Sequence, residues 1–139
     1  MFKHILLATD GSAAAERAAD YTASLAMHYD ARVTVLYVYA ELSTILGDPT
    51  YGQTLNHLLR EAASVVVRTA DKLHGLGVAV EEDALAGQPA TVILNVAESR
   101  KADVIIMGAC GVSRWNGLIL GSTSMAVVQG AMCPVLVIK

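Results

Sequence analysis

Four short and nearly unbroken apolar runs constrain the fold of this chain more than any other feature. They are ILLAT at 5–9, VTVLYVY at 33–39, VIIMG at 104–108 and VLVIK at 135–139. Apolar runs without alternation are typical of strands buried on both faces, as in parallel sheets. A fifth run, VAVEEDAL at 78–85, is more polar, which predicts a strand at an edge of the sheet.

Helical spacing of apolar residues fills the segments between these runs. We expect one helix after a cap at Ser12, a longer one over the leucine-rich stripe at 55–73, one that opens at Pro89, and a short one over 122–130. Strands that alternate with helices imply right-handed crossovers. The pattern therefore predicts an α/β fold with an open, doubly wound sheet and helices on both faces.

The segment at 40–54 is the least regular part of the chain and carries two glycines and a proline. We interpret it as a loop over one end of the sheet rather than as a linker. A length of 139 residues suits one compact domain. The sequence thus predicts a single domain over 1–139.

Charge and apolar patterning argue against several classes of partner. The net charge is −3 and the ten basic residues are scattered, so a nucleic-acid surface is not expected. No apolar stretch approaches the roughly 18 residues of a membrane span, and the apolar run in MFKHILLATDGS is too short for a signal peptide. Cys110 and Cys133 lack metal or redox spacing. We therefore expect a cytoplasmic protein with a reduced pair of cysteines.

Glycines follow the run at 104–108, at positions 108, 111, 117 and 121, and the last precedes Ser-Thr-Ser. Such segments often bind phosphate, yet no lysine occurs between Ala102 and Ile138, and no G-x-x-x-x-G-K-[ST] is present. No G-x-G-x-x-G follows a strand either, so a dinucleotide fingerprint is excluded. What remains is G-x2-G-x9-G-S.

Each part of this remaining motif has a physical use. Gly108 would end the strand and let a ligand approach the backbone, and Gly111 can adopt a positive φ at little cost. The residues at 121–124 would form the first turn of a helix, where free N–H groups and the dipole attract an anion. Each charge-assisted hydrogen bond contributes about 1.5–3 kcal/mol, so a few amides could hold a polyphosphate without lysine.

The segments ILLATDGS, VTVLYV, ADVIIMG, GSTS and CPVLVI together resemble the universal stress protein family, and the resemblance runs along essentially the whole chain. It implies a five-stranded parallel sheet in the order 3-2-1-4-5. It also implies a role in the stress response and the binding of ATP or another adenine nucleotide. A further implication is a homodimer that pairs the C-terminal strand, residues 134–138, with its symmetry mate.

The resemblance also implies a set of nucleotide-binding residues drawn from several loops: Ala8, Thr9, Asp10, Val38, Met107, Gly108, Gly111, Gly121, Ser122, Thr123 and Ser124. In that set Val38 would offer its backbone to the adenine edge. Asp10 would lie beside the phosphates, which repel it unless a cation such as Mg²⁺ or Mn²⁺ intervenes. Tyr37 stands where relatives often have His, and Ala8 where they often have Pro, which leaves the ligand preference open.

Simpler roles remain open for several of these residues. Residues 10–12 could form only a turn and a helix cap, and Ser122 and Ser124 could serve only as caps. Val38 and Met107 would be core residues in any α/β fold. The histidines share no motif and are expected at the surface or the core edge; they are His4, His28, His57 and His74.

Three functions are compatible with these patterns. The first is a regulatory module that binds ATP, with no catalytic residue. The second is a slow metal-dependent nucleotide hydrolase, for which Asp10 is the sole candidate base. The third is an interaction module whose site stays empty, against which the complete glycine motif argues.

Overall fold

A parallel sheet of five strands forms the centre of the computed structural model, which describes residues 1–41, 50–109 and 120–139. The strands are β1 (His4–Ala8), β2 (Arg32–Tyr39), β3 (Val80–Ala86), β4 (Val104–Gly108) and β5 (Val135–Ile138). They lie in the order β3-β2-β1-β4-β5, and every pair is parallel. This arrangement confirms the expected doubly wound sheet and its strand order.

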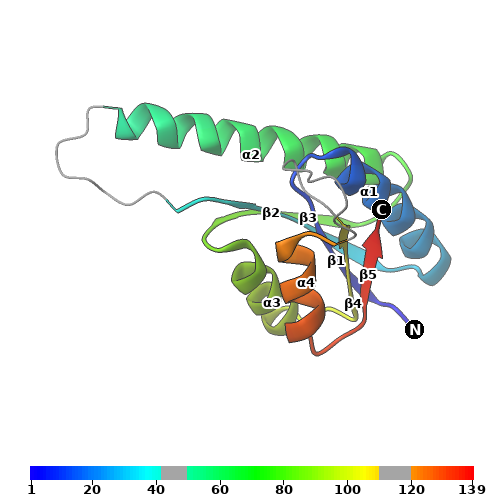
Figure 1. Cartoon of the computed structure of the whole chain (residues 1–139). Coiled ribbons are helices and arrows are strands. Elements are labelled where there is room, and N and C mark those ends of the chain that lie inside the picture. The colour runs from blue at the N-terminus through cyan, green and yellow to red at the C-terminus, as the bar shows by residue number, and fades with distance from the viewer. Residues whose placement is uncertain (42–49, 110–119) are drawn as a thin grey trace.

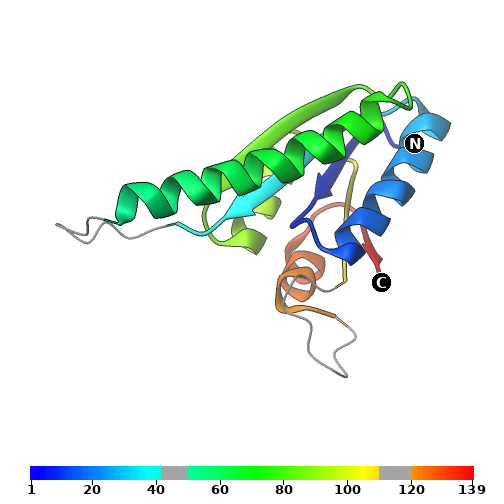
Figure 2. The same cartoon turned by 90° about the horizontal axis from the view of Figure 1, so that it is seen from above.

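Helices cover both faces of the sheet (Figure 1). They are α1 (Ala13–Tyr29), α2 (Tyr51–His74), α3 (Pro89–Ser99) and α4 (Ser122–Gly130). Helices α1 and α2 lie on one face, and α3 and α4 on the other (Figures 1 and 2). None of the helices in the described ranges is long and apolar enough to cross a bilayer.

The adjacent interior strands β1 and β4 are buried on both faces, as their unbroken apolar runs predict. Along β1, Ile5 and Leu7 face α1 and α2, whereas Leu6 and Ala8 face α3 and α4. Successive side chains of a strand point to opposite faces, so an apolar residue is needed at every position. The core thus lies in two layers, one on each side of β1 and β4.

The edge position of β3 is also confirmed, since within the described sheet this strand pairs with β2 alone. Most of its side chains are exposed, and they include Glu81 and Glu82. Charged side chains on an edge strand oppose pairing with a further chain. The polar character of the run at 78–85 therefore reflects this edge.

One boundary prediction is wrong. The segment at 40–54 is not a loop to its end, because α2 begins at Tyr51. Gly52 lies in the first turn of this helix, where amides lack an intrahelical partner in any case, so a glycine is better tolerated there than in the helix interior. Residues 42–49 of that segment lie outside the described residues.

His4 also departs from its expected place, because it is only 4% exposed. Its Nδ1 lies 3.0 Å from the carbonyl oxygen of Arg100, and its Nε2 lies 2.8 Å from Thr34 Oγ1. A carbonyl can only accept, so Nδ1 carries a proton. The backbone N–H groups of Lys3 and His4 donate to Asp103 Oδ2, each at 2.8 Å, and these bonds lower the pKa of that carboxyl.

Candidate functional site

A cavity of about 430 Å³ opens at the carboxyl ends of β1, β2 and β4. It lies where the strand order reverses, because the chain winds from β1 to β2 on one side and places β4 on the other. Open α/β sheets bind ligands at such a point. Its volume falls in the range typical of small-molecule sites.

All the predicted site residues that the structure describes line this cavity: Ala8, Thr9, Asp10, Val38, Met107, Gly108, Gly121, Ser122, Thr123 and Ser124. The remaining one, Gly111, lies outside the described residues, as do Cys110 and Gly117. Segments far apart in the sequence thus meet at one place.

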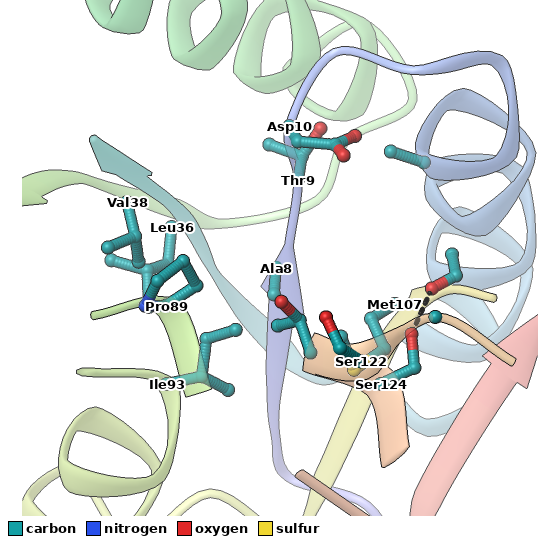
Figure 3. A pocket seen from close by; sticks show the side chains of 14 residues that line it. Ala8, Thr9, Asp10, Leu36, Val38, Pro89, Ile93, Met107, Ser122 and Ser124 are labelled. Atoms are coloured by element: carbon teal, nitrogen blue, oxygen red, sulfur yellow. Dashed lines mark hydrogen bonds between the residues drawn. The ribbon is translucent and has the colours of Figure 1, made fainter. Parts of the chain in front are cut away.

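The cavity has an apolar and a polar side (Figure 3). Leu36, Val38, Pro89 and Ile93 gather on one side, whereas Ser122 and Ser124 lie across from them, with Ala8 between. Asp10 is the one charged side chain among the described residues of the wall. The wall can therefore hold a ligand with a flat apolar part and a polar tail.

Val38 offers its backbone to the apolar side. The carbonyl of Leu36 points toward β1, where it accepts from the amide of Thr9 at 2.9 Å, and Ala8↔Leu36 is the last β1–β2 pair. Backbone orientation repeats every second residue along a strand. The N–H and C=O groups of Val38 consequently point in the same direction as the carbonyl of Leu36, but they lie beyond the last residue of β1.

Helix α4 brings its N-terminus to the polar side. Gly121 is its N-cap residue, with φ −69° and ψ 163°, and no described side chain caps the helix. The amide of Gly121 donates to Ala109 O at 2.6 Å, whereas those of residues 122–124 have no acceptor among the described residues. These free donors and the helix dipole favour a negative charge at this spot.

The hydroxyl of Ser124 has a structural role. It donates to the carbonyl of Gly108 at 2.8 Å and lies 3.1 Å from that of Ala109, and the residue is 3% exposed (Figure 3). Its single proton is therefore engaged within the protein. Ser124 can donate to a ligand through its backbone amide, whereas Ser122 can also use its hydroxyl.

Gly108 is required for a different reason from the one its motif suggests. A Cβ atom at this position would lie 2.9 Å from Ala14 Cβ and 2.9 Å from the backbone nitrogen of Ala15. The backbone that comes close to Gly108 is therefore that of α1. Gly108 therefore makes room for a helix, and it also lines the cavity, so its approach to a ligand stays a prediction.

The loop at 9–12 has well-defined internal contacts. Asp10 Oδ1 accepts from the amide of Ser12 at 2.9 Å, and Ser12 Oγ accepts from the amide of Ala15 at 3.2 Å. Gly11 adopts φ +78°, which few other residues tolerate. The turn and cap expected as the simpler role of this loop are present, and one oxygen of Asp10 remains for another partner.

Tyr37 lies next to this loop, on the other face of β2 from Val38. Burial raises the pKa of its phenol, and the negative charges of Glu61 and Asp10 raise it further. The hydroxyl thus stays protonated at neutral pH and can act as a hydrogen-bond donor near Asp10.

A metal ion held by the protein alone has little support in the described part of the chain. No group of three or more His, Cys, Asp or Glu side chains there could hold one. A single carboxylate nevertheless suits Mg²⁺, which commonly takes one or two protein carboxylates together with phosphate oxygens and waters. The second carboxylate oxygen of Asp10 could bind a Mg²⁺ ion that phosphate oxygens and waters also coordinate, but it could not hold the ion by itself.

Four residues of the wall were not predicted: Ala15, Leu36, Pro89 and Ile93. A signal for two of them was present. Pro89 opens the helix that follows β3, so it lies at the carboxyl end of the sheet, and Ile93 lies one turn further on the same side. Nothing in the spacing of Ala15 and Leu36 distinguishes them from core residues.

Comparison with known proteins gives a consistent result. The family model described as the universal stress protein family matches residues 1–139. A universal stress protein of Thermus aquaticus is 41% identical over 141 residues, covering 100% of each chain. The solved universal stress protein UspA of Lactobacillus plantarum superposes with a TM-score of 0.90 at 25% identity, covering 99% of this chain and 98% of its own.

A further solved structure, the universal stress protein of Archaeoglobus fulgidus in complex with dAMP, shares the fold. Its TM-score is 0.75 at 23% identity, covering 100% of this chain and 98% of its own.

Proposed function

Because the chain belongs to the universal stress protein family, we propose that it is a regulatory protein of the stress response that binds an adenine nucleotide, with ATP as the first candidate. The observation that carries this proposal is the uncapped N-terminus of α4 on the polar side of a cavity whose other side is apolar. The same fold accommodates dAMP in the Archaeoglobus fulgidus protein.

The two sides of the cavity suggest an orientation for the nucleotide. The base would pack between Val38 and the α3 residues Pro89 and Ile93. Its polar edge would meet the backbone N–H and C=O groups of Val38, which point past the end of β1. Apolar walls with a few placed polar groups are the usual composition of such sites.

The phosphates would lie against the first turn of α4. The amides of residues 122–124 are free donors, and the hydroxyl of Ser122 adds another. Each hydrogen bond to a charged group contributes about 1.5–3 kcal/mol. Three such bonds can therefore replace the lysine that other phosphate loops use.

Asp10 would contact the phosphates through a divalent cation. Mg²⁺ or Mn²⁺ would neutralise the repulsion between the carboxylate and the phosphate oxygens. Oδ1 of Asp10 already accepts from Ser12, so its other oxygen would face the ion. ATP affinity should accordingly be higher with Mg²⁺ than with EDTA.

We propose binding rather than efficient turnover. Proton transfer by the protein would depend on Asp10, the one acidic side chain among the described residues of the wall. Among the described residues of the wall, charge that develops during phosphoryl transfer would be met only by uncharged donors, the amides at 122–124 and the hydroxyl of Ser122. A slow hydrolase that uses Asp10 remains the alternative, and turnover lost in Asp10→Asn but present in wild type would favour it.

Mass spectrometry of the ligand released from natively purified protein tests the proposal, followed by calorimetry with ATP, ADP, AMP and cyclic AMP. We expect saturable binding of at least one adenine nucleotide below millimolar concentration, with GTP weaker. If none binds at millimolar concentration, the proposal is wrong, and an interaction module with an empty site becomes the better account.

We also propose a homodimer through residues 134–138. β5 is an edge strand of the described sheet, and exposed apolar side chains occur on the preceding helix and in the turn that leads to β5, including Met125, Val128 and Met132. Pro134 O and Ile138 O point toward β4, so the backbone groups of Val135 and Val137 point to the open edge. Natural proteins seldom leave such an edge bare.

Val137→Pro tests this dimer. It removes an N–H on the open edge without removing a bond to β4, and proline is tolerated at such positions. Light scattering should show a dimer for wild type and for Val137→Ala, and a monomer for Val137→Pro. A monomeric wild type at micromolar concentration would rule the dimer out.

Cytoplasmic location stays a prediction, which cell fractionation would check.

A further inference from the structure

Helix α3 connects the cavity to a polar cluster at the opposite end of the sheet. Its first residue, Pro89, and Ile93 one turn later line the cavity. Its last residue is Ser99, and Arg100 follows directly as the C-cap. An α-helix of 11 residues is about 16 Å long, so these two places are roughly that far apart.

The polar cluster at the far end, which we call the anchor cluster, consists of His4, Thr34, Glu81, Asp83 and Arg100. Arg100 Nη1 lies 2.7 Å from Glu81 Oε2, and Arg100 Nη2 lies 2.5 Å from Asp83 Oδ2. The carbonyl of Arg100 accepts from His4 Nδ1 at 3.0 Å. Nε2 of His4 in turn lies 2.8 Å from Thr34 Oγ1. The end of α3 is thereby tied to β1, β2 and β3.

Asp83 depends on Arg100 in particular. Its Oδ2 is buried and has no hydrogen bond of good geometry to any described residue. The guanidinium of Arg100 at 2.5 Å is therefore its compensating charge. Loss of that charge would leave a buried carboxylate oxygen unpaired, which strongly disfavours the present arrangement.

Apolar packing holds one side of α3 against the sheet and α4. Four of its residues are buried, and two of these are alanines: Ala90, Ile93, Val96 and Ala97. Val92 and Leu94 pack against the same core and are partly buried. Apolar burial stabilises in proportion to the area buried, so alanines contribute little. Over a length of about 16 Å, a tilt of about 4° at one end moves the other end by about 1 Å.

We propose that Arg100 is a positioning residue of the nucleotide site: it fixes the tilt of α3 and so sets the wall formed by Pro89 and Ile93. The inference rests on the proposed function and deepens it. Arg100 itself does not line the cavity. Its effect reaches the base through the helix, and it has no contact with the phosphates.

Arg100→Gln tests this role, with Lys72→Gln as the matched control. Lys72 forms an ion pair with Asp20 between α2 and α1, and neither residue lines the cavity. Both variants remove one positive charge; Arg100→Gln breaks two partly exposed ion pairs, with Glu81 and Asp83, and Lys72→Gln breaks one, with Asp20. Affinities for ATP and for adenosine would be measured by calorimetry and by NMR titration.

We expect Arg100→Gln to weaken ATP and adenosine by the same factor, about three- to tenfold, because binding walls need placement to about 0.5 Å. Lys72→Gln should change neither affinity by more than about 1.5-fold. Exposed ion pairs contribute little even to stability, and this pair does not line the cavity. A loss for ATP alone would indicate a simple charge effect and overturn the proposal. Unchanged affinities in Arg100→Gln, or equal losses in both variants, would also overturn it.

If circular dichroism shows that Arg100→Gln does not fold, Asp83→Asn is measured in its place. It removes the ion pair between Arg100 and Asp83. We expect it to weaken ATP and adenosine equally, by a smaller factor than Arg100→Gln. Wild-type binding separates the two proposals. If wild type binds no adenine nucleotide, the proposed function fails; if it binds another adenine nucleotide but not ATP, that nucleotide replaces ATP in the comparison. If wild type binds and the variants match it, only the role of Arg100 fails.

Discussion

The N-termini of α1 and α4 face the same cavity but differ in how their free amides are satisfied. In α1, Ser12 Oγ accepts from the amide of Ala15, and Asp10 Oδ1 accepts from that of Ser12. In α4, the N-cap residue is Gly121, and no side chain among the described residues caps it. Both helices follow a central strand of the sheet, β1 and β4 respectively.

This difference separates a helix end that serves the fold from one that can serve a ligand. Capping side chains satisfy donors that would otherwise need water or an anion. Where a glycine takes the cap position, the donors stay available. Both Gly108 and Gly121 line the cavity, but Gly108 also lies against the backbone of α1, where an added Cβ would not fit.

The largest effect is expected where α1 meets β4. Gly108→Ala would place a Cβ 2.9 Å from the backbone nitrogen of Ala15, so the first turn of α1 must shift. We expect a loss of about 2–3 kcal/mol in the free energy of unfolding, measured with urea. Gly52→Ala is the matched control, because no atom of the described residues lies within 4 Å of the added carbon. Equal stability of the two variants would contradict the close approach.

Gly121→Val should act on the ligand instead of the fold. The φ and ψ of Gly121, −69° and 163°, are accessible to valine. The added side chain would enter the cavity beside the free amides, so we expect ATP affinity to fall about thirtyfold, or about 2 kcal/mol. Unfolding free energy should change by less than about 1 kcal/mol. If calorimetry shows that Gly121→Val binds ATP as tightly as wild type does, the phosphates lie elsewhere.

Ser12→Ala removes the cap of α1 and is the converse experiment. The loss of the Ser12 cap should lower the free energy of unfolding by about 1 kcal/mol. ATP affinity should stay within about twofold, since Ser12 does not line the cavity. A large loss of affinity without a loss of stability would mean that the end of α1, too, serves the ligand.

Ser122→Ala should have the smallest effect. The hydroxyl of Ser122 faces the cavity (Figure 3), and its loss leaves the backbone amide in place. We expect ATP to bind about two- to fivefold more weakly, in line with one hydrogen bond, while adenosine affinity and stability stay unchanged. An equal loss for adenosine would assign this hydroxyl to the base or ribose.

Local patterns predicted most of the fold. The helix at 122–130, the cap at Ser12 and the first-turn proline Pro89 were all expected and are present. Each is encoded by a few neighbouring residues, through periodicity or capping chemistry. The loops that meet at the cavity were also expected, because a parallel sheet brings strand ends together.

Features that depend on distant contacts were not predicted. The buried state of His4 requires partners at 34 and 100, and the need for glycine at 108 arises from a helix that begins at 13. For the wall at 89 and 93, the first-turn proline marks the carboxyl end of the sheet, but the place where α3 crosses the sheet is not visible in the sequence. Spacing along the chain carries no signal for the contacts of His4 and Gly108 until the topology is known.

The central claim is that main-chain amides of α4 hold the phosphates. The most direct test is a titration of ¹⁵N-labelled protein with ATP, followed by amide chemical shifts and compared with adenosine. We predict large, saturable shifts at residues 122–124 with ATP that adenosine does not produce, and smaller shifts at 13–15, where α1 is capped. Saturable ATP binding that leaves the amides at 122–124 unmoved would contradict the account.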